Sequence, residues 1–120
     1  MLPRHAVHVL GLCNLVAGAL VAGAPSLLMP GADGLGSLSA RLLGSSLGVV
    51  LAAIGTGAWL MPPAAVRGYL WLFGVGVKFV AAAVWGIAAV HSGIATIWIG
   101  SMLDVIVAAV ITFVLMGSRR

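Results

Sequence analysis

Two oppositely charged residues stand inside long apolar runs, where charged side chains are rare. Lys78 lies within "GVGVKFVAAAVWG" and Asp104 within "SMLDVIVAAV". Lys78 comes 13 residues before His91, and Asp104 comes 13 residues after it. An ammonium and a carboxylate in such surroundings could form an ion pair, respond to a proton or bind a polar ligand.

The spacing predicts that the two charges meet. If the two runs form an antiparallel helical hairpin that turns at residues 91–93, both charges lie about 20 Å from the turn, near mid-membrane. An isolated charge at that depth costs about 2.5–3.5 kcal/mol, and an opposite charge in contact offsets much of this cost. We therefore expect a Lys78–Asp104 ion pair, with Arg41 as a competitor for Asp104 or the third member of a triad. A functional polar centre and a structural pair that fixes helix register both stay open, and the structural pair is favoured.

The composition indicates an integral membrane protein. Of the 120 residues, 62% are hydrophobic and 7% charged, whereas soluble domains carry about 25% charged residues. The net charge of +4 comes from a few scattered basic residues, so we expect no nucleic-acid partner. Cys13 excludes an intrachain disulfide and is interpreted as a small buried hydrophobic residue.

Four apolar runs are long enough to cross a bilayer. A hydrocarbon core of about 30 Å needs about 20 helical residues, and turn residues separate four such runs, at about 6–29, 39–61, 67–90 and 94–116. We expect an all-α, up-down-up-down bundle of four transmembrane helices in a single membrane domain, 1–120. The beginning of the first run resembles a secretory signal, but the apolar residues continue past Pro25, which favours an uncleaved span. Arginines at both chain ends and in the middle loop predict cytoplasmic termini.

Small residues recur every fourth position, which is typical of close helix packing in lipid. In the hairpin register, Gly74 faces Ala108, Ala82 faces Gly100, and Gly86 faces Thr96. On the second run the four-residue row is Gly44, Gly48, Ala52 and Thr56. The predicted helix-packing residues are therefore Gly44, Gly48, Gly74, Gly86 and Gly100. Asn14, in the first run, is expected to join the polar core around Lys78 and Asp104 by a hydrogen bond.

The sequence contains no pattern that predicts catalysis or a cofactor. His8 and His91 fall at opposite membrane surfaces, which disfavours a haem held by both. No HExxH, CxxC or carboxylate cluster indicates a metal site. The segment "GSSLG" at 44–48 lacks a histidine or acid placed to activate a serine. We therefore expect no enzyme activity, no cofactor and no metal.

Short segments resemble a known group of proteins. These are "NLVAG" at 14–18, "ARLLG" at 40–44, "GVGVKF" at 74–79 and "SMLD" at 101–104. Together they resemble small bacterial four-helix membrane proteins of the DoxX-like and BphX-like groups, whose functions are mostly unknown. The resemblance implies a four-helix bundle with Arg41, Lys78 and Asp104 as its polar core. It also implies an association with redox or oxidative-stress complexes, because DoxX relatives act as membrane partners there.

These observations predict a multi-pass protein of the inner (plasma) membrane that acts as an accessory or interaction subunit. Its partners would be the lipid bilayer and either another membrane protein or a second copy of the chain. The alternative is a small ion- or proton-coupled transporter that uses the Lys78–Asp104 pair. A multidrug exporter of the small resistance family is disfavoured, because that family needs a glutamate in its first span and this chain has Asn14 there and no glutamate.

Overall fold

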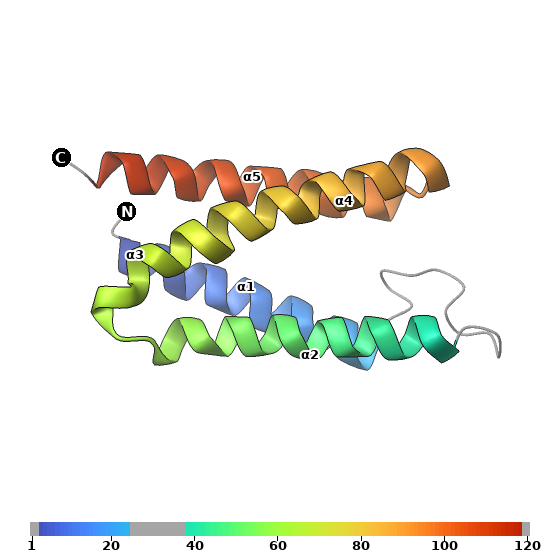
Figure 1. Ribbon diagram of the computed structural model, residues 1–120, viewed down its shortest axis with the longest axis horizontal. Coiled ribbons are helices and arrows are strands. Elements are labelled where there is room, and N and C mark those ends of the chain that lie inside the picture. Colours follow the sequence, from blue (N-terminus) through green and yellow to red (C-terminus); the bar gives the residue numbers. More distant parts are fainter. Residues whose placement is uncertain (1–2, 25–37, 119–120) are drawn as a thin grey trace. The chain divides into compact units, whose positions relative to one another are not determined.

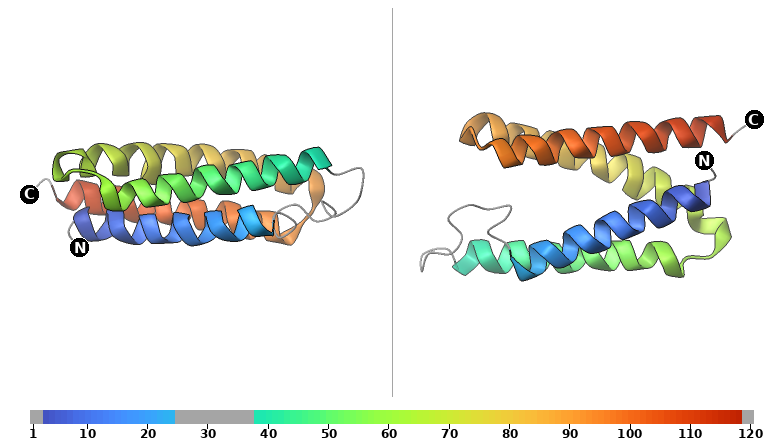
Figure 2. Two further views of the ribbon diagram at one scale, coloured as in Figure 1. Left: turned by 90° about the horizontal axis from the view of Figure 1, so that it is seen from below. Right: turned by 180° about the vertical axis from the view of Figure 1, so that it is seen from behind.

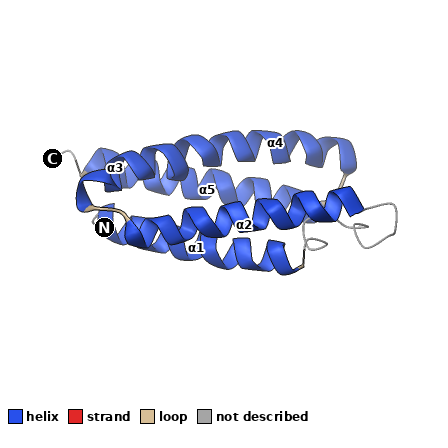
Figure 3. Cartoon of the chain, turned by 60° about the horizontal axis from the view of Figure 1, so that its bottom comes forward, coloured by secondary structure: helices blue, strands red, loops and turns tan. Residues whose placement is uncertain are grey.

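The computed structural model describes residues 3–24 and 38–118, and these residues form helices joined by short connections (Figures 1 and 3). The elements in chain order are α1 (Pro3–Gly23), α2 (Leu38–Leu60), the 3-10 helix η3 (Pro63–Ala65), α3 (Val66–Tyr69), the π-helix η4 (Leu70–Gly76), α4 (Val77–Ser92) and α5 (Ala95–Gly117). Four helices in the described ranges are long and apolar enough to cross a membrane. The predicted all-helical class is confirmed, with four helices of the length and composition that a membrane span needs.

The third span is one continuous helix from Pro63 to Ser92, in which η3, α3, η4 and α4 follow one another without a break. Pro63 suits the first turn of a helix, where its missing N–H has no partner to lose. Gly93 ends α4 with a left-handed φ of 68°, and its N–H bonds to the Ala89 carbonyl at 2.8 Å. Glycine is the usual residue at this position because it adopts positive φ without strain.

The helix bounds agree with the predicted spans to within a few residues for the second and fourth runs. The third helix begins four residues earlier and ends two residues later than predicted. The first helix ends at Gly23, and most of the predicted continuation to residue 29 lies outside the described residues. Cys13 is exposed rather than buried, so its interpretation as a core residue is wrong. A small apolar side chain at an exposed position of this helix suits contact with lipid.

The chain divides into two compact units, one formed by His8–Met61 and the other by Met1–Val7 with Pro62–Arg120. In the first unit, α1 and α2 run antiparallel and side by side (Figure 2). Their backbones meet at four glycines spaced seven residues apart on each helix: Gly11, Gly18, Gly48 and Gly55. A Cβ atom on Gly55 would lie 2.6 Å from the Gly11 carbonyl oxygen, and one on Gly48 would lie 2.7 Å from that of Gly18. Only glycine fits at these positions without moving a backbone.

The seven-residue spacing corrects the predicted four-residue row on α2. A helix has 3.6 residues per turn, so each four-residue step drifts about 40° around the axis, whereas seven residues nearly complete two turns. Gly44 and Gly48 are buried and Ala52 lies against Gly18. Thr56 has rotated off this face, is exposed, and bonds to the carbonyl of Ala52 in its own helix at 2.9 Å.

In the second unit, α5 packs beside the helix that runs through η4 and α4. The buried residues of α5 are Ser101, Ala108, Ile111 and Leu115, and together with Asp104 they alternate steps of three and four. The predicted contacts of Thr96 with Gly86 and of Gly100 with Ala82 are therefore wrong. Thr96 is exposed, and a Cβ on Gly100 would meet nothing within 4 Å. The cause is the same drift of the four-residue row.

A pair of substitutions two residues apart on α2 tests the glycine contact. Gly55→Ala is expected to destabilise the protein by about 1–3 kcal/mol, because its Cβ would overlap the α1 backbone. Gly57→Ala is the matched control, since a Cβ there meets nothing within 4 Å; it should be neutral or stabilising by up to about 1 kcal/mol. The measurement is equilibrium unfolding in mixed micelles. Equal free-energy changes for the two variants would contradict the contact.

Candidate functional site

Lys78 and Asp104 form an ion pair in the second unit. The Nζ atom of Lys78 donates a hydrogen bond to Oδ1 of Asp104 at 2.7 Å. This is the pairing that the distance of each residue from the turn predicts. Each side chain is 17% exposed, so the pair is largely but not completely enclosed.

Backbone geometry sets the position of both charges. Lys78 is the second residue of α4 and follows Val77, whose N–H reaches back five residues to the Leu72 carbonyl of η4. π-helical turns are rare and often occur at functional sites. Asp104 lies near the middle of α5. The carboxylate and the ammonium therefore meet at the point where the third span changes from π to α geometry.

A serine hydroxyl supports the same register between α4 and α5. It lies one helical turn from the ion pair, on the side of the Gly93–Ile94 connection. Ser101 is buried, and its Oγ donates to the Ala82 carbonyl at 2.7 Å. A Cβ on Gly86 would lie 3.3 Å from that Oγ, so Gly86 leaves room for the hydroxyl. The predicted partner of Ala82 was Gly100, and the correction follows from the rotation of the contact face described above.

Arg67 fixes the opposite end of the hairpin. Its guanidinium donates to the Leu115 carbonyl and to the Ser118 Oγ, each at 3.0 Å. Arginine suits this position because the last carbonyls of a helix have no partner within the helix and carry partial negative charge. Arg67 lies 11 residues before Lys78, and Leu115 lies 11 residues after Asp104. The contacts of Arg67, Lys78 and Ser101 therefore belong to one register.

The other predicted core residues belong to the first unit. Asn14 is buried, with 2% of its surface exposed, and Arg41 is exposed near the start of α2. A hydrogen bond from Asn14 to the ion pair and a triad with Arg41 both stay predictions. Of the predicted packing glycines on the third span, Gly74 is buried within η4 and Gly86 faces Ser101.

Sequence reasoning missed three features of these hairpins. Ser101 could have been found by stepping three residues back from Asp104, because helical neighbours occur at three as well as four positions. Arg67 was interpreted only as a topology signal. The imidazole of His8 stacks on the Trp59 indole, with ring centroids 4.5 Å apart and planes 4° from parallel, a contact that only the paired α1 and α2 reveal.

An ion pair of this geometry has two chemical capabilities. It can fix one register between helices, since any slip separates the charges, and it can exchange protons, since both groups are titratable. Comparison with known proteins does not choose between them, because no family model, curated protein or solved structure matches this chain.

A double-substitution cycle tests the coupling of the two charges. Lys78→Met or Asp104→Leu alone should destabilise the protein by about 2.5–3.5 kcal/mol, because each leaves one charge unpaired at mid-span. The combined variant should recover most of that loss, because replacing both partners by apolar residues removes the desolvation cost. The free energies come from equilibrium unfolding in mixed micelles.

The charge-exchanged protein, Lys78→Asp with Asp104→Lys, serves as a second check, since it keeps the pair and reverses its direction. Free-energy changes that simply add in the double variants would show that the two side chains do not stabilise one another.

Proposed function

We propose that this protein is a multi-pass protein of the inner (plasma) membrane that acts as an accessory or interaction subunit. The observation that carries this proposal is the ion pair: each mid-span charge finds its partner within one hairpin, at 2.7 Å. Charges neutralised in this way stabilise a fixed helical scaffold. The proposal includes an up-down-up-down bundle with both termini in the cytoplasm, supported by the positions of the arginines and by the two-residue connection Gly93–Ile94 between α4 and α5.

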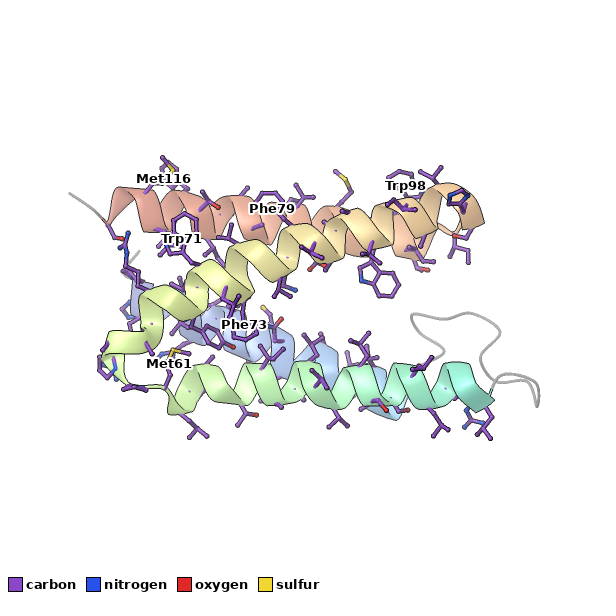
Figure 4. All side chains as sticks on the ribbon, in the orientation of Figure 1. Met61, Trp71, Phe73, Phe79, Trp98 and Met116 are labelled. Carbon is purple, nitrogen blue, oxygen red and sulfur yellow. The ribbon has the colours of Figure 1, made fainter. Side chains whose placement is uncertain are left out.

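The outer surface of the hairpins supports contact with lipid and with another membrane protein. Phe79, Trp98 and Met116 are exposed on the second unit (Figure 4), as are many branched aliphatic side chains on all four long helices. Such a surface suits lipid chains, and it can also receive the helices of a partner or of a second copy. The DoxX-like and BphX-like resemblance agrees with a partner role, with a redox or oxidative-stress complex as the proposed setting, and the proposal includes no catalytic site, cofactor or metal.

A small ion- or proton-coupled transporter is the second candidate. The observation in its favour is that the ion pair is titratable, lies at mid-span and keeps 17% of each side chain exposed. Intramembrane ionisable groups mark ion and proton pathways in many membrane proteins. In this candidate, breaking and re-forming the Lys78–Asp104 contact would be the coupled step.

Purification and flux measurements distinguish the two candidates. The accessory role predicts that the tagged chain, extracted into lipid nanodiscs from native membranes, carries a second protein in constant molar ratio. It also predicts that the purified chain in proteoliposomes gives no ion or proton flux above empty vesicles. The control is Asp104→Asn, checked for folding by its helical circular dichroism. Flux by the unmodified protein that a folded Asp104→Asn variant lacks would replace the accessory role by transport.

A further inference from the structure

The ion pair leaves part of its hydrogen-bonding capacity unused. A lysine ammonium has three donors and a carboxylate has two acceptor oxygens, and the contact between Nζ and Oδ1 uses one of each. Within the described part of their own unit, residues 3–7 and 62–118, no second hydrogen bond or ion pair reaches either side chain. Since each side chain also keeps 17% of its surface exposed, the pair presents an open polar edge.

This open edge lies at the depth where a bilayer has no polar groups. The pair is 13 residues from His91 on both helices and 11 residues from Arg67 and Leu115 at the other end. These lengths correspond to about 20 Å and about 16 Å of helix, and half of a hydrocarbon core is about 15 Å. Lipid chains cannot bond to the free donors and acceptor, and such groups are strongly unfavourable in hydrocarbon when they stay unbonded.

The polar side chains nearest to the pair in its own unit are already engaged. The Ser101 hydroxyl is buried and donates to the Ala82 carbonyl, and the Thr112 hydroxyl donates to the Ala108 carbonyl in its own helix. The remaining titratable or charged groups described on α3 to α5 are Arg67, Tyr69 and His91. Arg67 bonds to the end of α5, Tyr69 lies nine residues before Lys78, and His91 is exposed at the turn.

We propose that water reaches the open edge of the Lys78–Asp104 pair and makes it a hydrated, proton-exchanging site in the middle of the membrane. A water molecule matches the chemistry of this edge, because it can donate to the carboxylate and accept from the ammonium at once. An exchange step is balanced: one proton leaves the ammonium for water, and water returns another. The inference rests on the membrane placement in the proposed function, and it adds solvent access to a pair that would otherwise only hold the helices in register.

The composition allows a direct measurement on the lysine. The chain contains a single lysine, Lys78, so protein labelled with [15N]lysine has only one side-chain ammonium signal. The full-length protein in lipid nanodiscs is transferred from H2O to D2O. Water access predicts that the Nζ protons exchange within seconds, while amide protons in the middle of α4 and α5 persist for hours. Nζ protons that persist as long as those amides would overturn the proposal, and so would protection by a second copy or a bound partner.

The carboxylate gives an independent second measurement. The chain has two acidic residues, so Asp33→Asn leaves Asp104 as the only source of a carboxylate side-chain carbon signal in [13C]aspartate-labelled protein. Water at the edge predicts a solvent isotope shift of this carbon between H2O and D2O, and no shift contradicts it. Both readouts leave the ion pair intact. They are also separate from the partner and flux measurements, so a dry pair would not disprove the accessory role, and a missing partner would not disprove hydration.

Discussion

The Lys78–Asp104 ion pair is the interaction on which the α3–α5 hairpin depends. In lipid, apolar side chains gain little by leaving the hydrocarbon for one another, so packing alone allows several helix registers of similar energy. Two opposite mid-span charges remove that freedom. A slip of one helical turn would carry Nζ about 5.4 Å away from the carboxylate and leave two charges unpaired. The bonds from Ser101 to Ala82 and from Arg67 to the end of α5 form in this same register.

In the α1–α2 hairpin, the register is fixed by the close fit of the two backbones and not by charge. Gly11, Gly18, Gly48 and Gly55 let the two backbones touch, so that many weak contacts add up over a short distance. If one helix slipped by one turn along the other, residues with a side chain would occupy the contact positions where only glycine fits. The register of the α1–α2 hairpin is therefore set by steric exclusion, and that of the α3–α5 hairpin by charge. Neither effect needs a hydrophobic driving force between the helices.

The sequence predicts contacts that depend only on the distance of each residue along its helix. It misses contacts that depend on the angle of each residue around the helix axis. The ion pair follows from counting residues to the turn, because the rise per residue is constant. The partner of Ala82 is wrong because a four-residue row drifts, so that Ser101 lies where Gly100 was expected. Gly55 is absent from the predicted packing residues because it lies on a seven-residue repeat with Gly48, and not on the four-residue row. The π-helix η4 carries no sequence pattern that would distinguish it from the α-helices on either side.

The presence of charges in this hairpin requires more than a structural explanation. Apolar residues of similar volume often replace buried ion pairs without loss of stability, or with a gain, so stability alone does not require a lysine and an aspartate at these positions. The Ser101 hydroxyl, in the space left by Gly86, and the Arg67 contact with Leu115 support the same register as the ion pair. Only the charged pair supplies an exposed hydrogen-bond donor and an exposed acceptor in the middle of the span, and two apolar residues would supply neither. We infer that this polar edge is what the ion pair adds to the hairpin beyond fixing its register.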